Sequence, residues 1–394
     1  MTRPLNILTL STLFPNAVNP NFGIFVERQA AELARRPKAN VTVINPIGIP
    51  PWPLNKLEQY APLNALPEHE TWNGLKVHRP RFTLVPKIGG VNNPKSIADA
   101  IIPLVERLHQ SQPFDLIDAE FFYPDGPAAL RIHQALDIPF TIKARGADIH
   151  HWGSDPKCRP QILEAADKAS GLLAVSSALI KDMASLGMDA DKITVHYTGV
   201  DQELFKPVDR IAAKADMDFR GPLLITTGAL ISRKNQALVI RAIAEIPNAT
   251  LLLAGSGEEE SSYRKLAKDM GVANRIRFLG NLPHAELAKL TAAADISILV
   301  SKSEGLANAW VEALACGTPV IISAAGGARE LVCSDVAGRI VDRDPQSIAQ
   351  AVEEILEHPA TQNDVRSTVS SFSWKNNGDQ LLSFFQSVAK SNGV

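Results

Sequence analysis

Two glutamates lie eight residues apart in the segment SEGLANAWVEALACGTPVI, where small and apolar residues surround them. Glu304 follows the apolar run DISILVSK in an expected loop, and Glu312 lies inside the helical pattern LANAWVEALACG. Gly305 has no side chain and therefore allows a ligand to approach the backbone closely. The first turn of a helix also leaves its N–H groups free. In this segment the free donors are the N–H groups of Leu306, Ala307 and Asn308.

This arrangement suits a ligand that carries both phosphate and hydroxyl groups. A helix N-terminus attracts phosphate through its free N–H groups and its dipole. The carboxylates of Glu304 and Glu312 can accept hydrogen bonds from hydroxyls. A sugar nucleotide offers both kinds of group. The alternative is a surface glutamate beside a helix glutamate that pairs with a nearby cation, and the spacing alone does not decide between the two.

Two cations and two glycines follow other expected strands of the same half. In TTGALISRKNQ, Gly228 permits a tight turn, and Arg233 and Lys234 come just before a helix. Two cations beside a helix N-terminus would neutralise a diphosphate, although exposed basic pairs are common. The segment lacks the GxxxxGK(S/T) spacing of a P-loop. In LLAGSGEEE, Gly255 lies at a comparable strand end, which is weak evidence by itself.

The first half of the chain has two comparable loops. In STLFPNAVNPNFGIFVERQ, Gly23 opens a helix whose N-terminus could receive a phosphate or a polar ligand, or simply ends a turn. It does not match GxGxxG, which disfavours a nicotinamide dinucleotide. In KARGADIHHW, Arg145 could bind an anion or a sugar hydroxyl and Asp148 could orient it, or the two could form a surface pair. We expect no metal at the adjacent His150 and His151, which point in different directions in most backbones.

The elements that must position these loops follow from the pattern of the whole chain. Short apolar runs alternate with amphipathic helical patterns over most of the 394 residues, which predicts parallel strands with helices on both faces. This length exceeds what one core usually supports. We therefore expect an α/β protein with two doubly wound domains, at residues 1–203 and 204–372. A helix at 373–394 follows and could pack back on the first domain.

Composition and charge narrow the classes of function. The net charge of −2 comes without a basic stripe, so we expect no nucleic-acid partner. No apolar run reaches the ~20 residues of a membrane span. The three cysteines lack metal-like spacing and indicate reduced thiols in a cytosolic protein. The Pro-rich segment 48–70 is aperiodic and predicts a long surface excursion.

Several motifs resemble those of family 4 retaining glycosyltransferases. Glu304 and Glu312 match that family's E-x7-E motif, and EGLANAWVEALACGTPVIISAAGGARELV is similar to its signature. LLAVSSALIKDMASLGMDADKITVHYTGVDQELFKP, IRFLGNL and LLLAGSGEE also fit, in the family's order. The resemblance implies the GT-B fold, in which two Rossmann-like domains with parallel sheets face each other across a cleft. The N-terminal domain would hold mainly the acceptor and the C-terminal domain mainly the donor.

The resemblance also implies roles for single residues. Glu304 would contact the hydroxyls of the donor sugar, and Glu312 would contact those of the ribose. Arg233 and Lys234 would bind the diphosphate, and Leu282 would lie near the base. Arg145 would join Arg233, Lys234 and Glu304 as a catalytic residue. The other implied residues are Gly228, Gly255, Gly305, Leu306, Ala307 and Asn308 on the donor side, and Gly23 and Asp148 on the acceptor side.

Four positions depart from the family's commoner pattern. Ala229 follows Gly228 where many members have an arginine, so Arg233 is inferred to cover that phosphate contact. Arg145 stands where many members have a histidine near the reacting sugar. The N-terminal loop reads NFGIF instead of a double glycine, and Thr198 replaces the usual asparagine.

The implied activity is metal-independent, retaining transfer of a sugar from a nucleoside-diphosphate sugar, with no cofactor. The acceptor would be a glycan or a lipid-linked molecule in exopolysaccharide or surface-glycan synthesis. We expect such an enzyme in the cytoplasm, peripherally at the inner face of the cell membrane. Two alternatives stay open: a GT-B sugar-nucleotide epimerase, and a non-catalytic sugar-nucleotide-binding subunit, for which the missing arginine at Ala229 argues.

Overall fold

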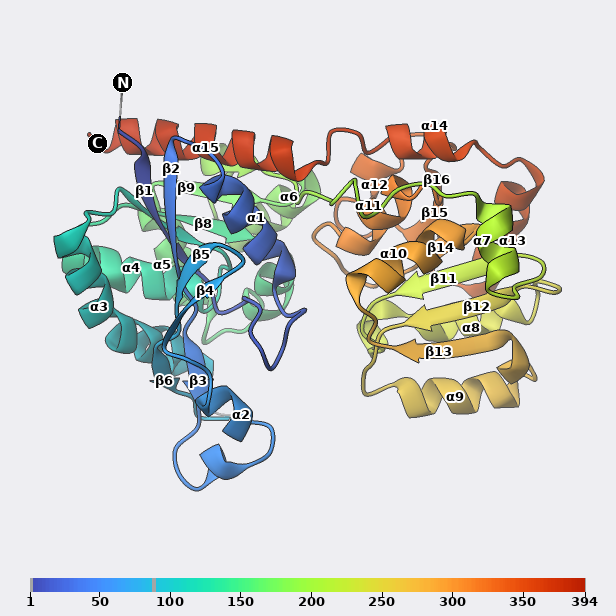
Figure 1. The fold of residues 1–394 in the computed structure, drawn as a ribbon, viewed down its shortest axis with the longest axis horizontal. Coiled ribbons are helices and arrows are strands. Elements are labelled where there is room, and N and C mark those ends of the chain that lie inside the picture. Colours follow the sequence, from blue (N-terminus) through green and yellow to red (C-terminus); the bar gives the residue numbers. More distant parts are fainter. Residues whose placement is uncertain (1–2, 87–89, 394) are drawn as a thin grey trace. The chain divides into compact units, whose positions relative to one another are not determined.

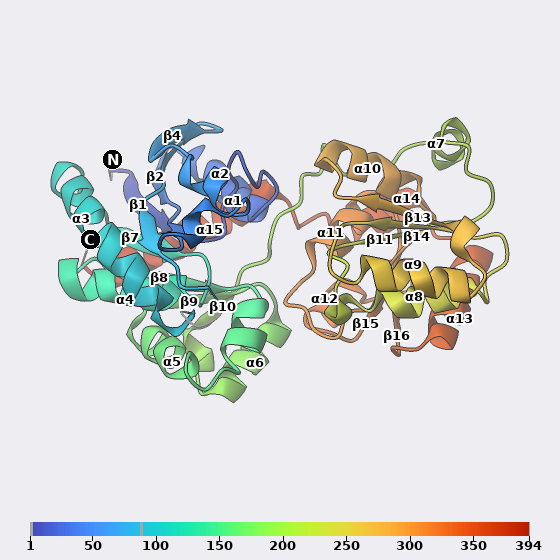
Figure 2. The same ribbon diagram turned by 90° about the horizontal axis from the view of Figure 1, so that it is seen from below.

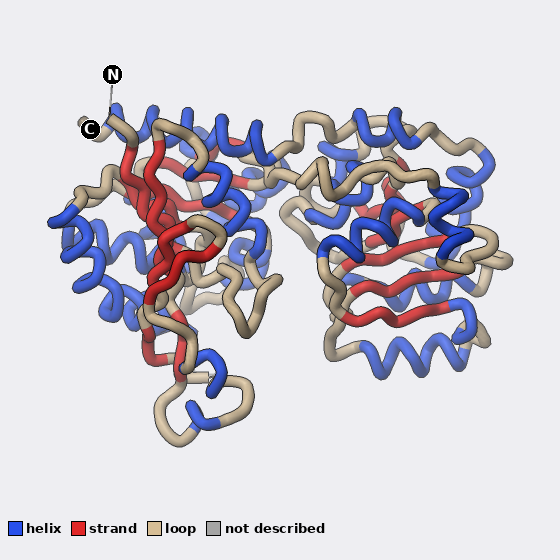
Figure 3. The backbone as a smooth tube through the Cα atoms, in the orientation of Figure 1, coloured by secondary structure: helices blue, strands red, loops and turns tan. Residues whose placement is uncertain are grey.

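The computed structural model describes residues 3–86 and 90–393, which divide into two compact units. The N-terminal unit comprises Met1–Gly199 together with Trp374–Val394, and the C-terminal unit comprises Val200–Ser373. The second unit thus begins a few residues before the boundary expected at residue 203. Each unit is an α/β structure around its own sheet, and Figure 3 shows its helices in blue against its strands in red.

The N-terminal unit is built on an eight-stranded sheet in the order β10-β9-β8-β7-β1-β2-β5-β4. Its pairings are parallel except that of β4 with β5. The central strands are buried on both faces, as a parallel sheet requires. The strands are β1 (Leu5–Leu10), β2 (Ala39–Ile44), β4 (His69–Trp72), β5 (Leu75–His78), β7 (Leu116–Ala119), β8 (Phe140–Ala144), β9 (Gly171–Ala174) and β10 (Ile193–Val195). A separate parallel pair is formed by β3 (Ile47–Ile49) and β6 (Arg81–Thr83).

The helices of this unit cover the two faces of the sheet. The long helices are α1 (Ile24–Ala34), α3 (Asn93–Ser111), α4 (Asp125–Leu136), α5 (Arg159–Lys168), α6 (Ser177–Leu186) and α15 (Trp374–Ser391). The shorter ones are η1 (Leu54–Lys56), α2 (Ala61–Asn64), η2 (Gly90–Asn92), η3 (Asp148–Trp152) and η4 (Ala190–Lys192). Figure 1 shows α15, the red helix, running alongside α1.

The last helix of the chain therefore completes the first unit. Leu381, Phe385 and Val388 of α15 lie in one buried cluster with Ile7 of β1 and Leu173 of β9. An ion pair between Arg36 and Asp379, 2.8 Å long, adds a polar contact beside this cluster.

The C-terminal unit has a six-stranded sheet in the order β13-β12-β11-β14-β15-β16, with every named pairing parallel. Each strand coincides with an apolar run expected from the sequence, and in the four central strands β12, β11, β14 and β15 Leu, Ile and Val fill positions buried on both faces. The strands are β11 (Leu223–Thr227), β12 (Thr250–Ala254), β13 (Ile276–Gly280), β14 (Ile296–Leu299), β15 (Val320–Ser323) and β16 (Gly338–Val341).

Helices cover both faces of this sheet as well. They are α7 (Arg210–Asp216), η5 (Ser232–Lys234), α8 (Gln236–Ile243), α9 (Glu260–Asp269), η6 (Ala273–Arg275), α10 (His284–Ala293), α11 (Asn308–Ala315), α12 (Ala328–Leu331), α13 (Pro345–Glu357) and α14 (Gln362–Ser367). Figure 2 shows α8, α9 and α13 on one side of this sheet and α7 and α10 on the other. One buried apolar cluster lies under the first group of helices and another lies under the second. Two α/β units with mainly parallel sheets confirm the predicted fold class. Among the described residues, no helix is long and apolar enough to cross a membrane.

Candidate active site

The strand order of the C-terminal unit marks a place for a ligand. From β11 the chain proceeds outward to β12 and β13, and it then returns to β14 on the other side of β11. Open α/β sheets bind ligands beyond the carboxyl ends of their strands where the order reverses in this way. The loops after β11 and β14 carry Arg233, Lys234 and Glu304, so the predicted cations and the first predicted carboxylate meet at this switch point.

These three side chains form an ion-paired cluster. Lys234 Nζ lies 2.5 Å from Glu304 Oε1, and a guanidinium nitrogen of Arg233 lies 3.4 Å from the same oxygen. Arg233 also donates to the carbonyl of Ser303, which ties the two loops together. The side chain of Glu304 is only 9% exposed, whereas that of Arg233 is 39% exposed. The three groups together carry one net positive charge, which suits an anionic ligand.

The backbone around this cluster leaves room for close approach. Gly228 has φ 146° and Gly255 has φ 139°, conformations that side chains rarely adopt. A Cβ at Gly255 would lie 2.1 Å from the carbonyl oxygen of Gly228, so the first loop packs directly on the second. Both predicted glycines therefore shape the loops beside Lys234.

The helix after Glu304 begins later than predicted. α11 starts at Asn308, two residues beyond the expected Leu306, and its N-cap Ala307 has no side chain that could bond the first turn. The side chains of Leu306 and Ala307 are buried. Glu312 lies inside α11 at intermediate exposure, and Gly317 ends the helix with φ 73°, as predicted.

A support for this loop was missed by the sequence analysis. Gly326 has φ 51°, and a Cβ there would lie 2.2 Å from the carbonyl oxygen of Glu304. The N–H of Gly327 donates to the carbonyl of Gly305 at 2.8 Å. The glycine pair after β15 therefore packs against the backbone that carries Glu304. The signal in the sequence was the pair itself, in SAAGGARE.

Leu282, predicted near the base, is half-buried among the apolar residues under α7 and α10. It follows β13 at the same edge of the sheet as Gly228 and Gly255. The structure thus places the predicted donor-side residues at the carboxyl ends of β11 to β14, in the loops there or, for Asn308 and Glu312, in the helix α11 that follows β14. Their contacts with a donor remain predictions.

The predicted acceptor-side residues belong to the N-terminal unit. Gly23 has φ 70° and is the N-cap of α1, and a Cβ there would lie 2.3 Å from the backbone of Leu13. Arg145 directly follows β8, with its guanidinium 4.6 Å from the ring of Phe25 at the start of α1. It also pairs with the carboxylate of Glu120, which follows β7, and only 6% of its side chain is exposed.

Asp148 is enclosed as well, and its carboxylate organises backbone. It is fully buried, and its oxygens accept hydrogen bonds from the N–H groups of Phe122, Arg145, Gly146 and Ile149. Burial raises the pKa of this carboxyl group, and these N–H groups lower it in part. Asp148 therefore fixes the loops after β7 and β8, and the expected surface pair between its carboxylate and the Arg145 side chain is not what the structure shows.

Four other buried polar residues of this unit escaped the sequence analysis. Glu120, Gln29, Lys143 and His196 are each at most 2% exposed and bond to one another. The available signal was Lys143, a charged residue inside the otherwise apolar strand FTIKA. Within the described residues, no group of three or more His, Cys, Asp or Glu side chains is arranged to hold a metal ion.

Comparison with known proteins identifies the family of the chain. Residues 208–371 match the family model described as glycosyl transferases group 1. Residues 24–204 match the model described as glycosyltransferase family 4. The chain is a family 4 glycosyltransferase. It is an enzyme of nucleotide-sugar glycosyl transfer, as the family resemblance predicted.

Relatives and solved structures extend this assignment. The chain is 25% identical, over 98% of its length and 100% of the relative's, to a putative teichuronic acid biosynthesis glycosyltransferase, TuaC, of Bacillus subtilis. Its fold is similar to that of sucrose-phosphate synthase from Thermosynechococcus elongatus, with a TM-score of 0.82, 20% identity and coverage of 98% and 100% of the two chains. HepE of Anabaena, solved with UDP and glucose, gives a TM-score of 0.73 at 21% identity, covering 97% and 100%. The predicted GT-B fold class is confirmed.

Proposed function

We propose that this glycosyltransferase moves a sugar from a nucleoside-diphosphate sugar to a glycan or lipid-linked acceptor, with retention of anomeric configuration and without a metal ion. The observation that carries the proposal is the cluster of Lys234, Arg233 and Glu304 at the switch point of the C-terminal sheet. It joins a diphosphate-binding charge to a carboxylate that can accept hydrogen bonds from sugar hydroxyls.

Departure of the leaving group is the step that needs the cations. As the bond between C1 of the sugar and the phosphate oxygen breaks, its electron pair stays on the diphosphate. Lys234 and Arg233 stabilise that charge, together with the uncapped first turn of α11. They are held in place by Glu304 before any ligand arrives, so little reorganisation is needed during the reaction. These two fixed positive charges take the place that a divalent cation would occupy beside a diphosphate, which supports a metal-independent reaction.

We propose front-face attack for the second half of the reaction. The acceptor hydroxyl oxygen forms its bond to C1 on the face that the diphosphate leaves, and its proton passes to a phosphate oxygen of the leaving group. Glu304 and Glu312 hold hydroxyls of the sugar and the ribose. The loops of Gly23, Arg145 and Asp148 shape the acceptor side.

A place in surface-polysaccharide synthesis is supported by the name of the Bacillus subtilis relative. A lipid-linked acceptor would bring the enzyme to the cytoplasmic face of the membrane. The Pro-rich excursion supports peripheral contact with lipid, because it exposes Trp52, Leu54 and Leu57 within six residues. Trp52 is 77% exposed, and tryptophan favours membrane–water interfaces.

The test begins with thermal unfolding in the presence of UDP-, GDP- and ADP-sugars, with and without EDTA. Stabilisation by one nucleotide that is unchanged by EDTA is the expected result, because a ligand that binds only the folded state raises its stability. NMR of the products made with a crude glycan acceptor then reports the anomeric configuration. An inverted product, or loss of binding in EDTA, contradicts the proposal. Conversion of the donor without acceptor to a second nucleotide sugar would identify an epimerase instead.

A further inference from the structure

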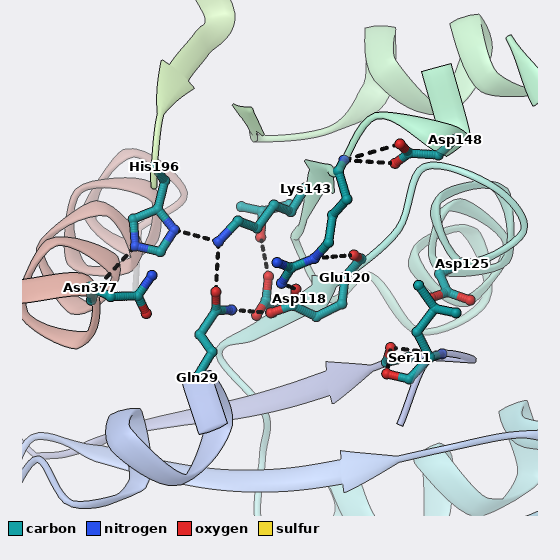
Figure 4. A network of polar contacts seen from close by, with 12 residues as sticks. Ser11, Gln29, Asp118, Glu120, Asp125, Lys143, Asp148, His196 and Asn377 are labelled. Atoms are coloured by element: carbon teal, nitrogen blue, oxygen red, sulfur yellow. Dashed lines mark hydrogen bonds and ion pairs between the residues drawn. The ribbon is translucent and has the colours of Figure 1, made fainter. Parts of the chain in front are cut away.

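A chain of buried polar side chains crosses the N-terminal unit, and the donor chemistry does not use it. Figure 4 shows its members pointing toward one another from α1, β8, the residue after β10, and α15. They are Gln29, Lys143, His196 and Asn377, with Glu120 after β7 at the far end. Each link is a hydrogen bond, so the chain can be followed atom by atom.

The first links join α15 to β8. His196 Nε2 lies 2.9 Å from the backbone carbonyl oxygen of Asn377, which can only accept, so this nitrogen carries the hydrogen. His196 Nδ1 is then the acceptor for Lys143 Nζ, 2.6 Å away. The side-chain amide of Asn377 donates in turn to the carbonyl of Tyr197 at 2.7 Å. Two hydrogen bonds of Asn377 therefore join α15 to the segment after β10.

The next links reach the loops of the acceptor side. Lys143 Nζ also donates to Gln29 Oε1 at 2.6 Å, which leaves the Gln29 amide N–H free to donate to Glu120 Oε1. The other oxygen of Glu120 accepts from Arg145, and Arg145 Nε donates to the Glu120 backbone carbonyl at 3.2 Å. Gln29 thus fixes the carboxylate that holds Arg145.

The surroundings of Lys143 allow it to keep both hydrogen bonds, to His196 and to Gln29, whether or not it is protonated. Burial, and the neighbouring charge of Arg145, lower the pKa of Lys143 to about 7, while Glu120 and Asp118 oppose that shift. Burial and Lys143 also lower the pKa of His196, which keeps the ring neutral. The two acceptors of Lys143 are neutral, so the amine can donate to both with or without its proton.

We propose that Gln29, Lys143 and His196 are positioning residues. They fix the Glu120–Arg145 pair, which lies at the start of α1, in its position relative to α15. None of them touches a substrate, because each is at most 2% exposed. A buried polar group that loses its hydrogen-bond partner costs stability, and its neighbours rearrange to find new partners. Loss of one link therefore loosens Arg145. An effect of this positioning on turnover rests on the proposed function, in which the Arg145 loop binds the acceptor. The positioning of Arg145 itself does not rest on that proposal.

The test measures the accessibility of Arg145 in the full-length protein by phenylglyoxal modification and peptide mass spectrometry. Gln29→Met keeps the volume and removes both links, and we expect modification of Arg145 to rise several-fold. Arg79 is the internal control, because its side chain is also enclosed in the same unit, at 0% exposure against 6% for Arg145, and it pairs with Glu70 at 2.6 Å. A parallel rise at Arg79 would indicate general loosening and would overturn the proposal, as would an unchanged Arg145.

Rescue by a conservative variant separates positioning from packing. His196→Leu removes both links of the ring, whereas His196→Gln retains an acceptor for Lys143 and a donor for Asn377. We expect Arg145 to become reactive in His196→Leu and to return toward the wild-type value in His196→Gln. Asp379→Asn is the matched control on α15, because it weakens the ion pair with Arg36 without touching the chain. Equal reactivity of Arg145 in all three variants would contradict the proposal. Nucleotide binding by the C-terminal unit, measured in the same samples, tests the proposed function separately.

Discussion

The carboxylate of Glu304 holds two cationic side chains, those of Lys234 and Arg233, at the carboxyl ends of the strands of the C-terminal sheet. Its carboxylate is nearly buried and is compensated by Lys234 and Arg233. A buried carboxylate without such partners is costly. In the proposed function, the same contacts that stabilise this loop would hold two cations for a diphosphate, which would then share them with Glu304.

Lys234→Ala tests this arrangement. We expect turnover to fall by roughly 100- to 1000-fold, the usual effect of removing one stabilising donor from a developing charge. The melting temperature should change little, because Arg233 still compensates Glu304. Lys302→Ala is the control, since Lys302 is exposed on the loop that carries Glu304 and its side-chain amine makes a 3.5 Å contact with Ser232. A similar loss in both variants, or a loss of stability in proportion to activity, would count against a specific phosphate contact.

Asp125 provides a prediction about pH. It is fully buried at the start of α4, and burial raises the pKa of its carboxyl group to about 7, although the N–H of Thr12 donates to it. The folded state therefore holds a proton between about pH 4 and pH 7 that the unfolded state has lost, and stability falls as pH rises through this window.

Asp125→Asn should remove that dependence, because the amide oxygen can still accept from Thr12 and does not titrate. We expect the melting temperature of the variant, relative to wild type, to be higher at pH 8 than at pH 5. Asp99→Asn, at an exposed ion pair with Lys95, should show no such trend. A difference that is equal at both pH values would mean that Asp125 does not titrate between pH 5 and pH 8 in the folded protein.

Among the elements, the loop after β14 depends on the loop after β15. Gly326→Ala would place a methyl group against the carbonyl of Glu304, at a backbone conformation that alanine disfavours. Gly271→Ala is the matched control, because Gly271 also has a positive φ of 70° but faces open space. We expect Gly271→Ala to cost about 1–2 kcal/mol from conformation alone. Gly326→Ala should cost clearly more in chemical denaturation and should weaken nucleotide binding. Equal costs would show that the close packing does not matter.

A separate prediction concerns the contact of the Pro-rich excursion, residues 48–70, with lipid. Replacing Trp52, Leu54 and Leu57 together by serine should reduce co-sedimentation with phosphatidylglycerol vesicles by more than tenfold, since each buried apolar side chain contributes about 1.5–3 kcal/mol. Ile211→Ser is the control, because Ile211 is 81% exposed on α7 of the other unit. If that change reduces sedimentation as much, or if the triple variant still sediments, the excursion is not the contact with lipid.

On the scale of the whole molecule, we expect a substitution that destabilises one unit to leave the stability of the other unit unchanged. Phe385 of α15 is fully buried in the core of the N-terminal unit. Phe385→Ala should cost about 3–5 kcal/mol in that unit. The stabilisation that a nucleotide gives to the C-terminal unit should remain, as hydrogen exchange with mass spectrometry can resolve by peptide. Loss of nucleotide protection in residues 200–373 would show that the units do not fold independently.

The sequence predicted most of the fold because its signals are local. Apolar runs located β11 to β16, and Gly317 marked the end of α11. The start of α11 was placed two residues early because Ala307 gives no capping signal. The Glu120–Arg145 pair was not predicted, because it joins residues that follow different strands. Gly326 was missed for the same reason, since its neighbour Glu304 becomes close only when β14 and β15 pair.

The position of α15 has a consequence for how the protein is made. The helix that closes the first core, with Leu381, Phe385 and Val388, follows the whole of the second unit in the chain and is therefore synthesised after it. Domains usually fold in the order of their synthesis. Here the second unit is complete in the nascent chain while apolar residues of the first, such as Ile7 and Leu173, still lack their cover. The first core can therefore close only after the second unit has been made, and a chain cut short before Trp374 would carry a complete second unit attached to an unfinished first one.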